Sequence, residues 1–282
     1  MGNEALLWIL QNEKDRQDRS GIYGYTQRTL AYNSNRIEGS TLTETQTAAL
    51  FEEGYPLVHG LCDNKAIAQT PSSDEVYKRK DIEEMNGHFL MFNKMIATMN
   101  EPLSESLIKS FHYELKAGVF EDRANGYAIG EYKQWRNTVG GMTLTAPDEV
   151  ANQMQNLLEW YHNQKDYTLE TLGILHAKYE MIHPFQDGNG RTGRMILYRE
   201  CLRQNIMPFI IHNENRIEYI SSLNKAQTGG DYADLVTLFE KEQLKYTEIY
   251  EYFNVEARYK YYLDNTEEDI TIGEVGESAP RI

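Results

Sequence analysis

The sequence predicts a mainly α-helical fold, and three observations support this fold class. Apolar residues recur at steps of three and four in almost every segment, which is the spacing of one buried helix face. Glycine, proline and asparagine fall mostly between these segments rather than within them. The pattern changes to a short strand-like run only within residues 130–147, so strands have little room in the chain.

The expected helices follow one another along the whole chain. They cover residues 4–16, 25–38, 43–53, 75–99, 104–118, 147–164, 169–182, 190–205, 216–227 and 232–263. Two of them begin with a recognisable start signal. Thr43 and Gln46 form a capping box, and Pro147 suits a first helical position because the N–H that it lacks would have no partner there.

One short β-hairpin is expected within residues 130–147. Val139 and Met142 lie there among threonines and glycines, in a run that is too short for a helix. Gly140 and Gly141 can adopt the positive φ angles that a tight hairpin turn needs. We predict no other pair of strands.

Composition excludes several classes of protein. The formal net charge of -15 argues against a protein that wraps nucleic acid, because that task needs a broad basic face. No run approaches the roughly 18 apolar residues of a membrane span, and the first residues lack the order of a signal peptide. We therefore expect a cytoplasmic protein with no nucleic-acid or membrane partner. Cys62 and Cys201 have no metal-ligand spacing, so we expect both to be reduced residues of the core.

The segment that follows residue 182 carries the most chemistry. Leu172, Leu175 and Tyr179 belong to a buried helix face that stops at residue 183. Residues 183–194 then read His-Pro-Phe-Gln-Asp-Gly-Asn-Gly-Arg-Thr-Gly-Arg. A glycine-containing loop that opens a helix suits an anion, because the first N–H groups of a helix have no partner within it and the helix dipole adds positive potential.

Four side chains in this run suit phosphate chemistry. Arg191 and Arg194 are three residues apart, project to one side and can each bind phosphate oxygens. Asp187 offers one carboxylate to a Mg²⁺ ion that phosphates and water would also coordinate. His183, with an ordinary pKa of about 6.5, suits a general base. Each of them alone also fits a cap, a turn or a solvated face, but together they predict a nucleotide site.

Residues 183–194 resemble the signature of Fic domains, His-Pro-Phe-x-(Asp/Glu)-Gly-Asn-Gly-Arg-x-x-Arg, at every specified position. The resemblance extends more weakly over about residues 75–240. It implies a Fic-type helical bundle with one short β-hairpin flap, and transfer of AMP from ATP to a serine, threonine or tyrosine hydroxyl of a protein. Mg²⁺ would be the cofactor. The 20 tyrosines make the chain itself one candidate target, and a homo-oligomer stays open.

The resemblance also implies roles for single residues. His183 would be the catalytic base, Asp187 the Mg²⁺ ligand, and Phe185 the apolar anchor of the loop. The nucleotide would be held by Gly188, Asn189, Gly190, Arg191, Arg194, Tyr219 and Gln227. Among these, the Asn189 amide would donate to the α-phosphate, whereas the helical neighbours of Tyr219 favour a core position for that ring. The target-docking flap would comprise Asn137, Thr138, Val139, Gly140 and Gly141.

A second motif lies near the start of the chain. Residues 34–39 read Ser-Asn-Arg-Ile-Glu-Gly and end an expected helix, and Ser34 and Glu38 share one face because they are four residues apart. Beside a Fic core they resemble the family's inhibitory motif, (Ser/Thr)-x-x-x-Glu-(Gly/Asn), in the arrangement where the inhibitory helix precedes the core. By this resemblance Glu38 would reach Arg194 and keep it from the γ-phosphate, while Ser34 would help to fix the helix.

The resemblance divides the chain into three parts. Residues 1–74 would form an N-terminal helical region with the inhibitory helix at about 25–39, and residues 75–240 the Fic core. Residues 241–282 would form a C-terminal helix and a tail. We expect the tail to be mobile, because residues 264–282 hold six acidic residues against one arginine and have no apolar period.

Three other functions stay open at this point. A glutamate near the phosphates suits Glu38-dependent removal of AMP from a modified protein. A nucleotide-gated binding module without turnover would need neither His183 nor Asp187, so their presence argues against it. A transcription regulator would need a basic helix-turn-helix, which residues 240–282 do not offer.

Overall fold

The computed structural model confirms the mainly α-helical fold and describes residues 3–53, 67–70, 73–139 and 142–273. Its helices are α1 (Asn3–Asp15), α2 (Ile22–Ile37), α3 (Glu44–Glu53), α4 (Arg79–Ala97), α5 (Glu105–Lys116), α6 (Phe120–Ala124), α7 (Val150–His162), α8 (Leu169–Ile182), α9 (Asn189–Arg203), α10 (Arg216–Gly229), α11 (Ala233–Tyr252) and α12 (Val255–Gly273). Short 3-10 turns, Pro147–Glu149 and Asn213–Asn215, precede α7 and α10. Within the described residues, no helix is long and apolar enough to cross a bilayer.

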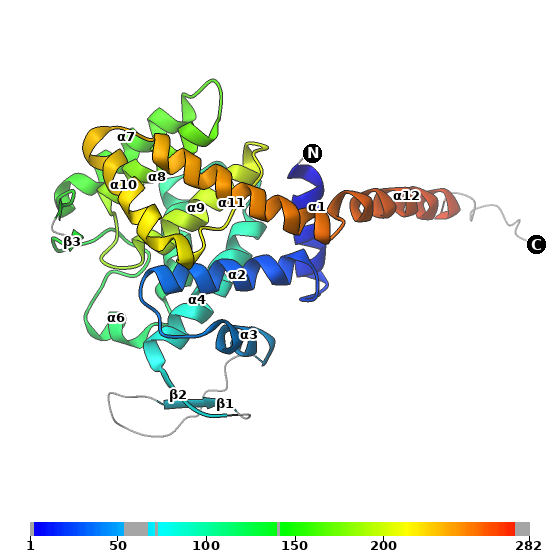
Figure 1. Cartoon of the computed structure of the whole chain (residues 1–282), viewed down its shortest axis with the longest axis horizontal. Coiled ribbons are helices and arrows are strands. Elements are labelled where there is room, and N and C mark those ends of the chain that lie inside the picture. The colour runs from blue at the N-terminus through cyan, green and yellow to red at the C-terminus, as the bar shows by residue number, and fades with distance from the viewer. Residues whose placement is uncertain (1–2, 54–66, 71–72, 140–141, 274–282) are drawn as a thin grey trace, which may run out of the picture.

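Helix α9 lies at the centre of the molecule (Figure 1). It is buried along most of its length and packs against α1, α2, α4, α5 and α8. The large core that surrounds it includes Phe92, Tyr161, Phe239 and Cys201, all essentially inaccessible to solvent. Cys201 is thus the small core residue that we expected, whereas Cys62 lies outside the described residues. A helix surrounded in this way fixes the position of the loop from which it starts.

Local start signals act as the sequence predicts. The N–H of Thr43 donates to Oε1 of Gln46 at 2.8 Å, and the N–H of Gln46 donates to Oγ1 of Thr43 at 3.2 Å, which completes the capping box before α3. Ser104 and Thr168 cap α5 and α8 in the same manner, because each side-chain oxygen accepts an N–H of the first turn.

The expected hairpin is present, and a second one was not predicted. Strands β3 (Thr138–Val139) and β4 (Met142–Thr143) pair antiparallel, with Val139 opposite Met142, while residues 140–141 of the turn lie outside the described residues. Strands β1 (Ile67–Thr70) and β2 (Ser73–Lys78) also pair antiparallel, so our restriction to one strand pair was wrong. Pairing with β1 overrides the helix that we expected from residue 75, and α4 begins at Arg79 instead.

The C-terminal region also differs from the prediction. The single helix expected over residues 232–263 is interrupted at Asn254, whose φ of 50° no helix accommodates. Helix α12 then packs on α1, where the Trp8 ring lies 4.9 Å from the ring of Tyr262, and projects away from the other helices (Figure 1). It continues to Gly273, so the first part of the expected mobile tail is helical. Residues 274–282 lie outside the described residues.

Three histidines are buried in this core in their neutral form. Burial lowers the pKa of His88, His112 and His176 to about 3. Between that value and the ordinary value of about 6.5, the unfolded chain binds more protons than the folded chain. Stability contributed by these groups therefore rises with pH through this window and is lost as pH falls through it.

We expect His88→Leu to flatten this dependence on pH. The free energy of unfolding, measured with urea between pH 6.5 and 4, should change less steeply in the variant by up to about 1.4 kcal/mol per pH unit. Burial raises the pKa of Glu180 to about 8, and this group gives a slope of the opposite sign. It acts equally in both proteins, so the comparison isolates His88. Identical slopes would show that the buried imidazole does not limit acid stability.

Candidate active site

The loop between α8 and α9 is shaped by two residues with positive φ. His183 ends α8 with φ 51°, and Gly188 precedes α9 with φ 83°. At Gly188 a side chain would also crowd Leu115 and Lys116, because a Cβ would lie 3.2 Å and 3.3 Å from their side-chain carbons. Between these two turns Phe185 is fully buried and stacks on the His112 ring, with centroids 3.9 Å apart. Phe185 therefore anchors the loop in the core, as expected.

Asn189 has a structural role in the loop that the sequence did not predict. Its Oδ1 accepts the N–H of Phe185 at 2.7 Å, and its Nδ2 donates to the carbonyl of the same residue at 2.8 Å. The side chain is buried, with 1% of its surface exposed. Since these two bonds direct the amide towards the backbone of the loop, Asn189 closes the turn. Its donation to an α-phosphate through the second N–H of Nδ2 stays a prediction.

Arg191 is held by acidic and amide side chains around it. Its guanidinium lies 2.6 Å from Oε2 of Glu84 and 3.4 Å from Oδ1 of Asp187, and it donates to Oδ1 of Asn35 at 3.3 Å. The two carboxylates raise the pKa of Arg191 against the opposing effect of burial. The guanidinium therefore stays charged, although only 3% of its side chain is exposed.

Arg194 contacts the predicted inhibitory motif directly. Its Nε donates to Oγ of Ser34 at 2.9 Å, and its NH2 group donates to the Ser34 carbonyl at 3.0 Å and to Oε1 of Glu38 at 2.7 Å. Ser34 and Glu38 come from the end of α2, some 156 to 160 positions away in the sequence. The structure thus places both specified residues of the motif at 34–39 against Arg194.

The Glu38 carboxylate lies at the N-terminus of α9. A Cβ added at Gly190 would collide with Oε1 of Glu38, so only a glycine leaves room for this carboxylate. Burial would raise the pKa of Glu38, but the charges of Arg194 and Arg191 outweigh it and hold that pKa below its usual range. An ionised carboxylate therefore occupies the place where a helix N-terminus and two arginines would attract an anion.

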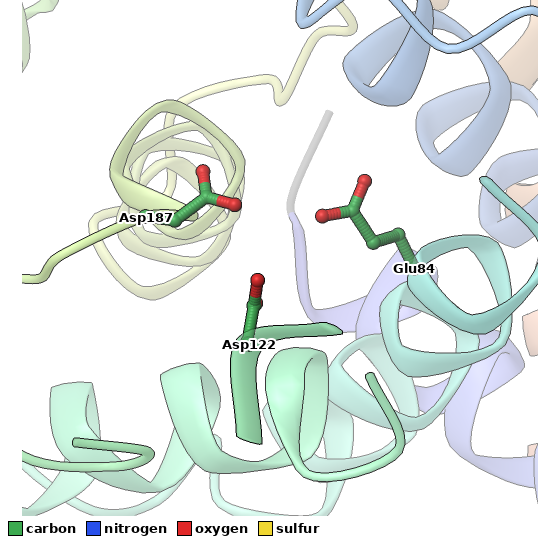
Figure 2. A group of neighbouring side chains, drawn as sticks. All are labelled: Glu84, Asp122 and Asp187. Carbon is green, nitrogen blue, oxygen red and sulfur yellow. The ribbon is translucent and has the colours of Figure 1, made fainter. Parts of the chain in front are cut away.

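Asp187 is surrounded by carboxylates and by positively charged side chains. Figure 2 shows its carboxylate pointing towards those of Glu84 on α4 and Asp122 on α6, and ligand oxygens of the three lie within 4.8 Å of one another. Carboxylate oxygens are ligands that Mg²⁺ prefers, so the Asp187 side chain suits the ion that the loop implies. The Lys116 ammonium lies 2.8 Å from Oδ2 of Asp187, and neighbouring cations keep the pKa of Asp187 far below its usual range despite burial.

His183 is neutral at physiological pH. Burial lowers its pKa to about 4. Its Nδ1 lies 3.3 Å from the carbonyl oxygen of Glu180. A carbonyl oxygen only accepts, so Nδ1 carries the proton and Nε2 holds the lone pair. The imidazole is therefore in the form that accepts a proton.

Two hydrogen bonds tie the segment before β3 to the loop, and a third lies within the segment. The N–H of Lys133 donates to the Pro184 carbonyl at 2.8 Å, and Nδ2 of Asn137 donates to the Phe185 carbonyl at 3.1 Å. The buried Lys133 ammonium also donates to Oδ1 of Asn137 at 2.8 Å, and burial lowers its pKa to about 8. Asn137 thus meets the loop, and Thr138 and Val139 follow it in β3. Gly140 and Gly141 lie outside the described residues.

The two residues proposed for the adenine pocket lie on α10 and face α8. Tyr219 is buried, and its hydroxyl lies 2.8 Å from Nε2 of His176, so its ring belongs to the core as its neighbours predicted. Nε2 of Gln227 donates to the Ala177 carbonyl at 3.3 Å. Neither contact reaches the loop, although the Arg194 guanidinium lies 5.9 Å from the Tyr219 ring centre.

Sequence reasoning missed Glu84, Lys116 and Asp122. They come from α4, the end of α5 and the unpredicted helix α6, and no spacing in the sequence links them to Asp187. A lysine and two acidic residues in partly buried helices are common in proteins, so they did not indicate a cluster around Asp187.

Comparison with known proteins agrees with the motif. Residues 102–201 match the Fic/DOC family. Among curated proteins, the chain is 26% identical over 202 residues to protein adenylyltransferase fic-1 of Caenorhabditis elegans, which covers 70% of this chain and 36% of that protein. It is 28% identical over 203 residues to protein adenylyltransferase Fic of Drosophila grimshawi, covering 70% of this chain and 38% of that one. The chain thus spans little more than a third of the length of these relatives.

Solved structures share the fold. A Fic domain containing signaling protein from Bacteroides thetaiotaomicron superposes with a TM-score of 0.59 at 24% identity, covering 91% of this chain and 93% of that one. Fic-1 (residues 134–508) from C. elegans superposes with a TM-score of 0.62 at 21% identity, covering 94% and 73%. With the loop motif, the family match and this shared fold in agreement, the chain carries a domain of the Fic/DOC family.

Proposed function

We propose that the chain transfers AMP from MgATP to a serine, threonine or tyrosine hydroxyl of a protein, and that its own Glu38 inhibits the transfer. The main support for this proposal is the position of the Glu38 carboxylate, which lies at the N-terminus of α9 and 2.7 Å from Arg194. Because this site binds the carboxylate of Glu38, it can also bind a nucleotide phosphate. The neutral His183 and the ionised Asp187 lie in the same loop. The curated relatives named protein adenylyltransferase support the same reaction.

The residues of the loop divide the work of the reaction. Nε2 of His183 takes the proton of the incoming hydroxyl, whose oxygen forms the new bond to the α-phosphorus while the bond to pyrophosphate breaks. The N–H groups at the start of α9, with Arg191 and Arg194, hold the phosphates. Asp187 would hold Mg²⁺, which neutralises phosphate charge when bound. We place this catalytic core at residues 75–240.

Inhibition follows from what Arg194 can bind at one time. While its NH2 group donates to Glu38, that group is not available to a γ-phosphate, so ATP lies in a pose unsuited to attack. Keeping about 99% of the molecules closed requires only about 2.7 kcal/mol of preference. A partly exposed ion pair supported by two bonds to Ser34 is of a kind that supplies this order of energy.

The flap is the proposed dock for the target. Asn137 fixes the start of β3 to the loop, so a target segment that adds a strand beside residues 138–139 would bring its hydroxyl towards His183. The chain's own hydroxyls are candidate targets as well.

The test is incubation of the purified chain with labelled ATP and Mg²⁺, with Glu38 intact and with Glu38→Gly. We expect label on protein, and mass spectrometry should find added AMP on a hydroxyl of the chain or of a supplied target. Absence of label from every protein in the Glu38→Gly reaction, although ATP binds, would contradict transfer and favour a binding module.

The position of Glu38 also favours a second candidate, removal of AMP from a modified protein. Its side chain is 38% exposed at the phosphate end of the loop, where a carboxylate can orient a water molecule. The two reactions assign opposite roles to Glu38. Glu38→Gly should raise transfer but abolish removal, so parallel assays on unmodified and AMP-modified protein separate them.

A further inference from the structure

A buried lysine lies at the centre of the acidic cluster beside the loop. The Lys116 ammonium is 2.7 Å from Oε1 of Glu84, 2.5 Å from Oδ2 of Asp122 and 2.8 Å from Oδ2 of Asp187. Its side chain is 1% exposed. Burying a charge is costly unless ion pairs and hydrogen bonds compensate for the lost water, and here three carboxylates do so.

The charges of the cluster balance without any added ion. Glu84, Asp122 and Asp187 carry three negative charges. Lys116 and Arg191 supply two positive charges at close range. The third comes from Lys80, whose ammonium lies 3.7 Å from Oδ2 of Asp187 and is more exposed. A divalent cation added to the free protein would therefore enter a neutral cluster whose central position already holds an ammonium ion.

The carboxylate of Asp187 is also fixed in orientation. Its Oδ2 accepts from Lys116 at 2.8 Å, while Oδ1 accepts the N–H of Gly188 at 2.7 Å. Both oxygens are thereby held on the side of α5 and of the turn into α9. Without the ammonium, three carboxylates whose oxygens lie within 4.8 Å of one another would repel one another and attract a cation from solution.

We propose that Lys116 is a positioning residue that makes binding of a divalent cation at Asp187 depend on the nucleotide. Its ammonium keeps the carboxylate oriented and the cluster neutral, so a divalent cation binds well only when phosphates bring further oxygens and negative charge. This inference rests on the proposed metal role of Asp187, but not on AMP transfer.

The test is a Mn²⁺ titration of the full chain, followed by electron paramagnetic resonance, with and without an ATP analogue whose α,β bridge is methylene. For the wild type we expect weak binding without nucleotide and at least about tenfold tighter binding with it. Lys116→Met should bind Mn²⁺ at least about tenfold more tightly than wild type in the absence of nucleotide, whereas Lys116→Arg should behave as wild type.

Lys109→Met is the matched control. This lysine lies on the same helix and pairs with Glu131 at 2.8 Å, on the surface and away from the cluster, so its loss should leave Mn²⁺ binding unchanged. Equal affinity of the wild type with and without nucleotide would overturn the proposal, and so would unchanged affinity in a folded Lys116→Met. Should circular dichroism show that Lys116→Met does not fold, the wild-type comparison decides alone. Failure of AMP transfer would leave these affinities untouched.

Discussion

Glu38→Gly is expected to raise the initial rate of AMP transfer about a hundredfold, which is what about 2.7 kcal/mol of released restraint represents. The reason is the 2.7 Å ion pair between Oε1 of Glu38 and Arg194, which is lost in the variant. The freed arginine can then bind the γ-phosphate. The measurement is incorporation of labelled AMP into a proven target at equal concentrations of enzyme.

Two further variants identify the cause of this gain. The gain should vanish in Glu38→Gly combined with Arg194→Ala, because the released guanidinium is what the first change provides. Ser34→Ala removes only the 2.9 Å bond to Nε of Arg194 and should give a much smaller increase. An unchanged rate in Glu38→Gly would mean that the end of α2 has no inhibitory role, even if the loop is catalytic.

His183→Ala is expected to reduce transfer by about 10²–10⁴-fold, the usual contribution of a general base, while ATP binding changes little. The imidazole is neutral at physiological pH, because burial lowers its pKa to about 4, and the contact of Nδ1 with the Glu180 carbonyl leaves the lone pair on Nε2. In the proposed mechanism it acts on the hydroxyl rather than on ATP. Rates should be compared in the Glu38→Gly background, where transfer is measurable.

Asp187→Ala and His162→Ala provide the contrast. Loss of Asp187 should weaken Mg²⁺-dependent nucleotide binding as well as turnover, since the carboxylate is the proposed ligand. His162, the last residue of α7, contacts the Leu103 carbonyl away from the loop, and its removal should leave both properties intact. Comparable labelling by His183→Ala would remove this histidine from the mechanism, and unchanged MgATP affinity in Asp187→Ala would contradict the metal assignment.

The parts of the site that are local in sequence could be predicted from the sequence. Helix α8 ends at Ile182, where the His-Pro pair follows, and α9 starts within one residue of the predicted position. Both boundaries depend on turn chemistry within a few residues. The contact of Glu38 with Arg194 spans 156 positions, and only the family resemblance anticipated it.

The parts that depend on tertiary packing could not be predicted. Lys116 meets Asp187 only because α5 packs against α9, and no periodicity in either segment records that contact. The Asn189 amide bonds the carbonyl and the N–H of Phe185 because the turn brings them within reach, and this geometry is not visible in the sequence. Residues 73–78 form strand β2 because they pair with β1, and the sequence of these six residues alone does not indicate that partner.

Gly190 links the catalytic loop to a helix that lies outside the matched family segment. Any side chain at this position would displace the Glu38 carboxylate, just as it would crowd a phosphate at the start of α9. Under the proposed function, a mutation at Gly190 would release Glu38 and crowd the nucleotide site at the same time. Ser34 and Glu38, by contrast, lie before residues 102–201. Under the proposed function, regulation and catalysis are therefore encoded in separate segments, and changes in α2 alone would weaken or strengthen the inhibition.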